Sequence, residues 1–211
     1  PDGEPIVHLD GWSHAGNHTV FNSLVWGPDG WLYGCNGNAN HSLVGKPGSP
    51  KGERKQLNCG IWRYHPVRRE FEVVAHGTAN PWGLDFNDYG EGFFTNCVIG
   101  HLSHLIPGAH YRRIHGRQYS PHTYDLLDAC SDHYHFAGKD WKFSRGDVGK
   151  EVHEDAGGGN AHAGAMVYLG GAWPDRYRDS MFMCNLHGNR INQDQLERKG
   201  SGYVGHHKKD F

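Results

Sequence analysis

Two short apolar stretches separated by Gly-Pro-Asp-Gly constrain the fold of this chain more than any other feature. Residues 24–26 and 31–35 flank Gly27-Pro28-Asp29-Gly30, in which proline presets φ and glycine takes the left-handed conformation. This pattern predicts a β-hairpin. Residues 60–64 and 70–74 flank a second turn, and the four strands together predict one antiparallel blade of a β-propeller.

The hairpin pattern recurs twice later in the chain, at residues 81–86 with 92–97 and at residues 165–168 with 180–184. Each second strand ends on a cysteine at the same spacing of five residues, from Gly30 to Cys35, Gly92 to Cys97 and Asp179 to Cys184. Matching strand ends predict an internal structural repeat.

We therefore expect one all-β domain over residues 1–211, a partial β-propeller of about three four-stranded blades. The blade units are expected at about 18–79, 80–118 and 160–211, with an irregular insertion at about 111–160 that includes a short helix at 124–129. Propellers typically have four or more blades, and three would leave unpaired edges. The expectation is that the chain is a fragment of a longer propeller, or that another chain in an oligomer completes the ring.

Composition excludes several classes of function. The net charge of −2 provides no basic field for nucleic acid, and no apolar run is long enough to span a membrane. The chain opens at Pro1 rather than methionine, so a targeting segment is expected to have been removed or left out.

Five cysteines are scattered along the chain without any C-x-x-C motif, which excludes a zinc ribbon and covalent c-type haem within these residues. Cys35 ends one expected strand and Cys59 begins the next, so the two face each other across a blade either as a disulfide or as free buried thiols.

Eighteen histidines are the compositional outlier, and blade geometry places many of them together. The loop before the first strand of a blade and the loop between its second and third strands lie on the same face. These loops carry most of the distinctive polar residues: His14, Asn17, His18, Asn22, Asn36, Asn38, His76, Asn80, His101, His104, Asn160, His162, His187, Asn189 and Arg190. We expect this face, at the mouth of the channel, to bind a ligand.

Individual positions on this face have alternative interpretations. His162 lies in a glycine-rich segment at 157–164, where backbone can approach a ligand closely. Asn80 is either a ligand contact or the cap of a turn. His133 and His135 lie on one side of an extended segment, a spacing used for copper or zinc, and no carboxylate or cysteine partner is identified for them. His101 is interpreted as a loop histidine rather than a ligand.

Three segments resemble the soluble glucose/sorbosone dehydrogenase propellers, and the resemblance covers nearly the whole chain. The segments are residues 24–34, 80–86 and 163–178. The resemblance is closest to a branch named membrane-bound dehydrogenases, abundant in planctomycetes. It implies a secreted or periplasmic oxidoreductase that uses pyrroloquinoline quinone and calcium to oxidise a sugar or polyol, with a c-type cytochrome as a further electron acceptor.

Carried over by position, the resemblance implies His18 as the nearest candidate for the catalytic base and Asn80 as the residue that holds the cofactor; His187 stands where the family has lysine or arginine, and Ala79 where it has arginine. His162 of the glycine-rich segment is a second candidate base, and Arg190 is a further candidate contact of the cofactor or substrate. Two other classes remain open: a metal-dependent carbohydrate hydrolase or lyase, and a non-catalytic propeller that binds a carbohydrate or a protein.

Overall fold

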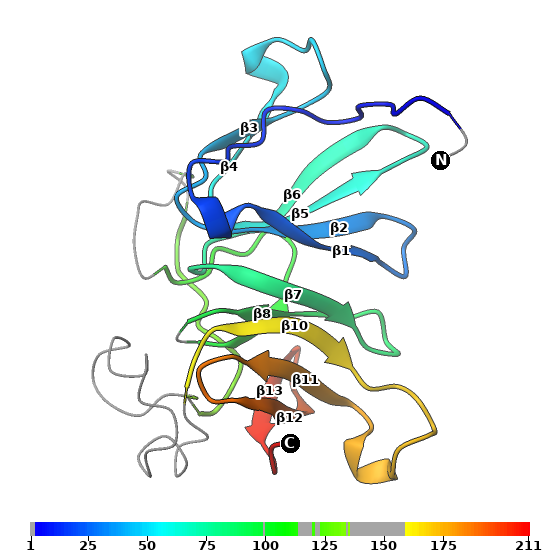
Figure 1. Cartoon of the computed structure of the whole chain (residues 1–211), viewed down its shortest axis with the longest axis vertical. Coiled ribbons are helices and arrows are strands. Elements are labelled where there is room, and N and C mark those ends of the chain that lie inside the picture. The colour runs from blue at the N-terminus through cyan, green and yellow to red at the C-terminus, as the bar shows by residue number, and fades with distance from the viewer. Residues whose placement is uncertain (1–2, 99, 114–119, 121–122, 134, 136–158) are drawn as a thin grey trace.

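The computed structural model describes residues 3–98, 100–113, 120, 123–133, 135 and 159–211, and these residues form an all-β fold (Figure 1). The first blade has strand order β1-β2-β5-β6, the second β7-β8-β9, and the third β10-β11-β12-β13, all antiparallel; β3 and β4 form a separate pair. The strand bounds are β1 Phe21–Trp26, β2 Leu32–Asn36, β3 Ser42–Val44, β4 Lys55–Leu57, β5 Gly60–His65, β6 Glu70–His76, β7 Pro81–Phe86, β8 Gly92–Asn96, β9 Leu102–Leu105, β10 His162–Val167, β11 Ser180–Asn185, β12 Arg190–Lys199 and β13 Gly202–His207.

Helical structure in the described part of the chain is limited to three short 3-10 turns: η1 Asn17–Thr19, η2 Lys51–Glu53 and η4 Asp175–Tyr177. None of the described helices has the length and apolar character needed to cross a membrane. The predicted all-β propeller fold is therefore confirmed.

The first hairpin forms as the turn chemistry predicted. Gly30 has a φ of +80° and donates its backbone N–H to the carbonyl of Gly27 at 3.0 Å. The Asp29 side chain accepts from the backbone N–H of Trp31 at 3.2 Å, which fixes the far side of the turn. The next hairpin repeats this arrangement, because Gly90 has a φ of +78° and donates to Asn87.

The repeat is visible in the strand register, but the equivalent residue at the end of each second strand is an asparagine and not the predicted cysteine. The first strand of each blade begins opposite an asparagine that ends the second strand, in the pairs Phe21↔Asn36, Pro81↔Asn96 and His162↔Asn185. A register shift then follows within three residues in all three blades. The asparagines are therefore equivalent, and Cys97 is not equivalent to Cys35 and Cys184, because Thr95 occupies that position.

Two other expectations need correction. Among the described residues, the second blade has three strands in its own sheet rather than four. The chain after β9 instead pairs with the first blade, through a parallel bridge between His76 and His110. The predicted helix at 124–129 is absent, because this segment is extended and Leu127 forms a parallel bridge with Tyr111.

Two of the three apolar cores in the described residues lie between blades, and the third packs Trp62 and Tyr64 of the first blade against Leu57 of β4. Leu84 and Phe94 of the second blade pack with Ile61 of the first, whereas Phe93 packs with Met181 of the third. The second and third blades approach so closely that a Cβ added at Gly83 would lie 2.4 Å from the backbone of Gly164. The sheets are thus stacked face to face in chain order (Figure 1), which brings their loops to common faces.

Apolar side chains remain exposed where a closed ring would cover them. Leu24 and Trp26 on β1 are 57% and 61% exposed, and Met166 on β10 is 38% exposed. The third blade also has an open apolar groove lined by Met166, Trp173 and Ile191 together with Phe182, Cys184 and Phe211. These surfaces are consistent with the expectation that further blades complete the ring.

The cysteines in this structure are free thiols, so Cys35 and Cys59 adopt the second of the two predicted alternatives. Both are fully buried, and burial raises the pKa of each thiol to about 12; the pKa values of Cys97 and Cys130 are raised to about 12 in the same way. Cys184 is exposed.

We expect a maleimide at pH 8 to label Cys184 rapidly in the folded protein and the other four cysteines only after unfolding, because reactivity requires an accessible thiolate. Peptide mapping of the labelled sites by mass spectrometry measures this. The Cys184→Ser variant should lose the fast phase. Rapid labelling of Cys35 or Cys59 in the folded protein would contradict the described packing.

Candidate metal centre

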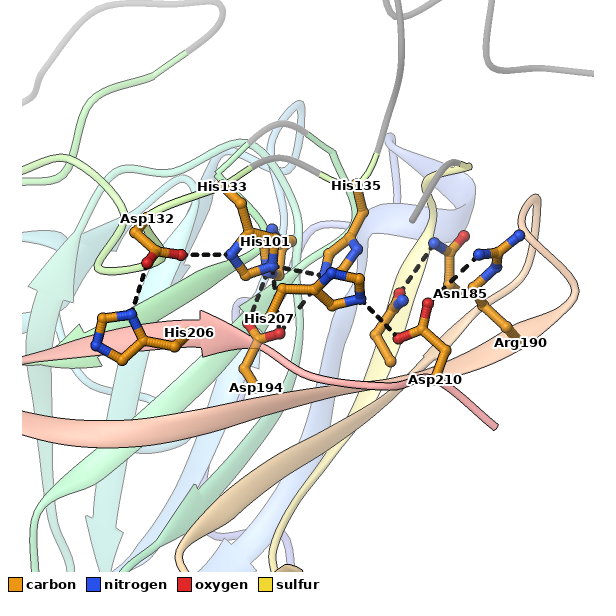
Figure 2. A network of polar contacts seen from close by, with 11 residues as sticks. His101, Asp132, His133, His135, Asn185, Arg190, Asp194, His206, His207 and Asp210 are labelled. Atoms are coloured by element: carbon orange, nitrogen blue, oxygen red, sulfur yellow. Dashed lines mark hydrogen bonds and ion pairs between the residues drawn. The ribbon is translucent and has the colours of Figure 1, made fainter. Parts of the chain in front are cut away.

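Three separate parts of the chain supply a compact cluster of metal-ligand side chains. His101 immediately precedes β9 in the second blade, and Asp194 lies in β12 of the third blade. His133 and His135 belong to the predicted insertion. The cluster therefore lies where the second blade, the third blade and the insertion meet (Figure 2).

Backbone hydrogen bonds position the insertion at this junction. The N–H of Cys130 donates to Leu102 in β9 at 2.9 Å, and the N–H of Asp132 donates to Gly205 in β13 at 3.0 Å. Gly205 donates in return to Cys130 at 3.0 Å. These bonds hold the start of the segment between two strands, so the histidines that follow project over Asp194.

The four side chains converge on one point. Each offers one ligand atom, and these atoms all lie within 4.8 Å of one another. His101 Nε2 lies 2.8 Å from Asp194 Oδ2, while Nε2 of His133 and of His135 lie 3.3 and 3.6 Å from Asp194 Oδ1. The two Nε2 atoms are themselves 3.1 Å apart. Three imidazoles facing one buried carboxylate at this spacing match the donor set of a mononuclear metal site.

The electrostatics favour the ligand forms of two of these groups. Burial lowers the pKa of His101 to about 4, and the nearby Asp194 charge only partly offsets this effect. Burial alone would raise the pKa of Asp194, but the electrostatic interaction with His101 and hydrogen bonds from the three histidines hold it well below its usual value. Asp194 is therefore an anion and His101 a neutral imidazole.

His133 behaves differently. Burial alone would lower its pKa, but hydrogen bonds and charges from Asp194 and Asp132 outweigh burial and raise it. In the metal-free protein the carboxylates on either side of this imidazole therefore favour its protonated form. A metal ion would take the place of that proton on Nε2.

His162 lies directly beside the cluster. It is 2% exposed, and its ring centroid is 4.9 Å from that of His101 and 5.2 Å from that of His135. Neither of its ring nitrogens has a hydrogen-bond partner of normal geometry among the described residues. Burial lowers its pKa well below the usual value, which leaves a neutral ring next to the candidate ligands.

A second layer of polar residues surrounds the ligands. His206 on β13 contacts Asp132, which contacts His133. On the other side, the His207 ring stacks on that of His133 at 5.0 Å. His207 Nε2 lies 3.0 Å from Asp210, which also pairs with Arg190 at 3.3 Å (Figure 2).

The residues predicted from sequence are only partly brought together. His133, His135 and His162 meet at the cluster, and Arg190 reaches its second layer through Asp210. His18 is instead exposed on η1, which precedes the first blade.

Asn80 and His187 have structural roles through their backbones. Asn80 is 8% exposed; its N–H donates to Asn96 Oδ1 at 2.7 Å and its carbonyl accepts from Cys97 at 2.9 Å. His187 lies in the turn after β11, where its N–H donates to Asn160 at 3.2 Å. The bonds of Asn80 are made by its backbone, and its buried side-chain Oδ1 has no hydrogen-bond partner among the described residues, so they do not decide between a turn cap and a ligand contact.

Two of the four candidate ligands were not predicted as ligands from the sequence. His101 was interpreted as a loop histidine, but it is 1% exposed and faces Asp194. Asp194 is 0% exposed in the middle of β12 and lies two residues from buried Leu196. An aspartate on the buried side of a strand rarely occurs without a partner, and this was the signal that could have identified it.

The implied quinone and calcium fit the described residues poorly. Pyrroloquinoline quinone is an anionic tricarboxylate, and its binding needs permanently charged cations. Ala79 supplies no charge, and Arg190 already pairs with Asp210. Calcium prefers six to eight oxygen ligands, whereas the cluster offers three imidazoles and one carboxylate.

Fold and site together define a β-propeller segment with a histidine-rich candidate metal centre. The chain belongs to the family described as Domain of unknown function (DUF7133), which matches residues 5–211. A comparison with curated proteins gave no match.

Among solved structures, the PQQ-bound aldose sugar dehydrogenase of Streptomyces coelicolor is similar in fold, with a TM-score of 0.53 and 18% identity. The likeness covers 91% of this chain and 49% of that enzyme, so the chain spans about half its length. The apo-form of the soluble aldose sugar dehydrogenase of Escherichia coli gives a TM-score of 0.42 at 11% identity, over 89% of this chain and 72% of that one.

Proposed function

We propose that His101, His133, His135 and Asp194 bind one divalent transition-metal ion and that this chain is the metal-binding part of an enzyme. The observation that carries the proposal is the convergence of four ligand atoms within 4.8 Å around a carboxylate that is 0% exposed. A buried charge without compensation is costly, and a bound cation compensates it directly.

The donor set selects the class of ion. Imidazole suits zinc, iron, copper and nickel, whereas magnesium and calcium prefer oxygen ligands. Four protein ligands leave a fifth position for water or substrate when the ion is five-coordinate. His162, which borders two of the ligands, is the side chain best placed to contact a group bound there.

Such a centre supports either redox chemistry or activation of a bound water. We favour an oxidoreductase that acts on a sugar or polyol, because the fold is shared with the Streptomyces aldose sugar dehydrogenase. The proposal includes completion of the propeller by further blades, for which the exposed apolar surfaces of β1 and the third blade give support.

The metal content of the purified protein tests the centre. Inductively coupled plasma mass spectrometry should find about one transition-metal ion per chain, and His101→Ala should reduce this below about a tenth, because a buried ligand is lost. His14→Ala removes an exposed histidine and should keep the wild-type content. The proposal fails if wild-type protein incubated with excess Zn²⁺ or Co²⁺ and desalted retains no stoichiometric metal.

Quinone-dependent oxidation is the second candidate, because the Streptomyces enzyme of the same fold binds PQQ. A secreted or periplasmic location and a c-type cytochrome acceptor belong to this candidate. Dye reduction with a panel of sugars separates the two: activity that requires the metal alone supports the first, and activity that appears only with added quinone and calcium supports the second.

A further inference from the structure

A chain of hydrogen-bonding groups leads from the surface of the third blade to the candidate metal ligand His133. Glu197 Oε2 lies 3.0 Å from His206 Nε2, and His206 Nδ1 lies 2.6 Å from Asp132 Oδ2. The other oxygen of Asp132 lies 2.8 Å from His133 Nδ1. Figure 2 shows Asp132 between the two imidazoles, with one oxygen directed at each.

We infer that Asp132 is the positioning residue of the metal centre, and that His206 and Glu197 hold it in place. The inference rests on the proposed metal site. It assigns a role to three residues outside the ligand set, and the role follows from what each contact does to His133.

The first effect is on the orientation of His133. A carboxylate accepts a hydrogen bond, so Asp132 requires the proton to be on Nδ1 of this imidazole. The remaining nitrogen, Nε2, then points to Asp194 and His135, at 3.3 and 3.1 Å. Without Asp132, the ring is free to rotate or to carry its proton on the nitrogen that should bind the metal.

The second effect is on charge. One carboxylate and three neutral imidazoles leave a divalent ion with one uncompensated positive charge. Asp132 supplies the second negative charge through His133 and makes this imidazole a stronger donor. It does so from a half-exposed position, since 47% of its side chain is accessible, so it carries little of the cost of a buried charge.

Asp132 is itself held in place by contacts with the third blade. An exposed carboxylate with one partner gains little from the contact, because water competes and the side chain loses freedom. Here its backbone N–H is bound to Gly205, and its second oxygen is bound to His206 on the same strand. Glu197 pairs with the far nitrogen of His206 from the neighbouring strand β12. Two strands of the third blade thus fix the carboxylate.

Titration of the metal-free protein with Co²⁺, followed by its visible absorption, tests this inference. We expect Asp132→Ala to bind one Co²⁺ with a dissociation constant about 10- to 100-fold higher than wild type. Asp132→Asn keeps an acceptor without the charge and should lie between the two. Asp125→Ala removes an exposed carboxylate elsewhere in the insertion and should bind as wild type does.

A second measurement separates positioning from a general structural role. The metal-free Asp132→Ala protein should unfold at the wild-type temperature, and its cobalt spectrum at saturation should differ from wild type. A lowered unfolding temperature with unchanged affinity and spectrum would overturn the inference while leaving the metal centre intact. Absence of Co²⁺ binding in the wild type would overturn the centre and this inference together.

Discussion

Replacement of Asp194 by asparagine is expected to abolish metal binding at concentrations that saturate the wild type. Asp194 is 0% exposed and faces all three histidines, so the substitution removes the only negative charge in the ligand set while keeping its shape. We expect the affinity for Zn²⁺ or Co²⁺ to fall by more than about a hundredfold. This exceeds the effect typical of residues that contact the ligands but not the metal. Isothermal titration calorimetry on metal-free protein measures the change.

The same substitution should destabilise the protein even without metal. Asp194 and His101 form a buried hydrogen-bonded pair at 2.8 Å, and weakening a hydrogen bond to a buried charged group costs about 1.5–3 kcal/mol. Urea denaturation of the metal-free protein would show this as a lower midpoint.

Asp125→Asn is the matched control, because it makes the same chemical change at an exposed position and should alter neither property. Wild-type affinity in Asp194→Asn would show that the ion does not bind at this cluster.

The strand repeats could be predicted from the sequence because their signals are local. Turns such as Gly27-Pro28-Asp29-Gly30 specify a hairpin within a dozen residues, and the short apolar stretches on either side specify its strands. Alignment of the cysteines by spacing alone places the second repeat two residues out of register, because Thr95 and not Cys97 is equivalent to Cys35. Alignment by Asn36, Asn96 and Asn185 would have given the observed register, since each ends a second strand.

The site could be predicted only in part because its residues are brought together by blade stacking. His133 and His135 were identified by their spacing, but their partners lie in other segments, and His101 is 93 residues from Asp194. Blade geometry predicted that the face would be rich in histidine. It did not determine which imidazoles share a carboxylate, because that depends on the pairing of residues 130–132 with β13.

Because the candidate ligands are far apart in the sequence, metal binding should have a large effect on the thermal stability of the protein. The unfolded chain holds its four ligands in three distant segments and therefore chelates weakly, whereas the folded chain presents them preassembled. A ligand that binds only the folded state stabilises it by RT ln(1 + [L]/Kd), about 2.7 kcal/mol at a concentration of one hundred times Kd. For a chain of 211 residues we expect the unfolding temperature to rise by about 5–10 °C.

Differential scanning calorimetry with Zn²⁺ at one hundred times its measured Kd tests this expectation, and excess chelator should return the transition to its metal-free temperature. Asp125→Asn should show the full shift, and Asp194→Asn should show none, because the latter lacks the only anionic ligand. A shift of equal size in Asp194→Asn would assign the stabilisation to another site. A shift in neither protein would mean that the second blade, the third blade and the insertion are held together by packing and hydrogen bonds alone, without a contribution from metal.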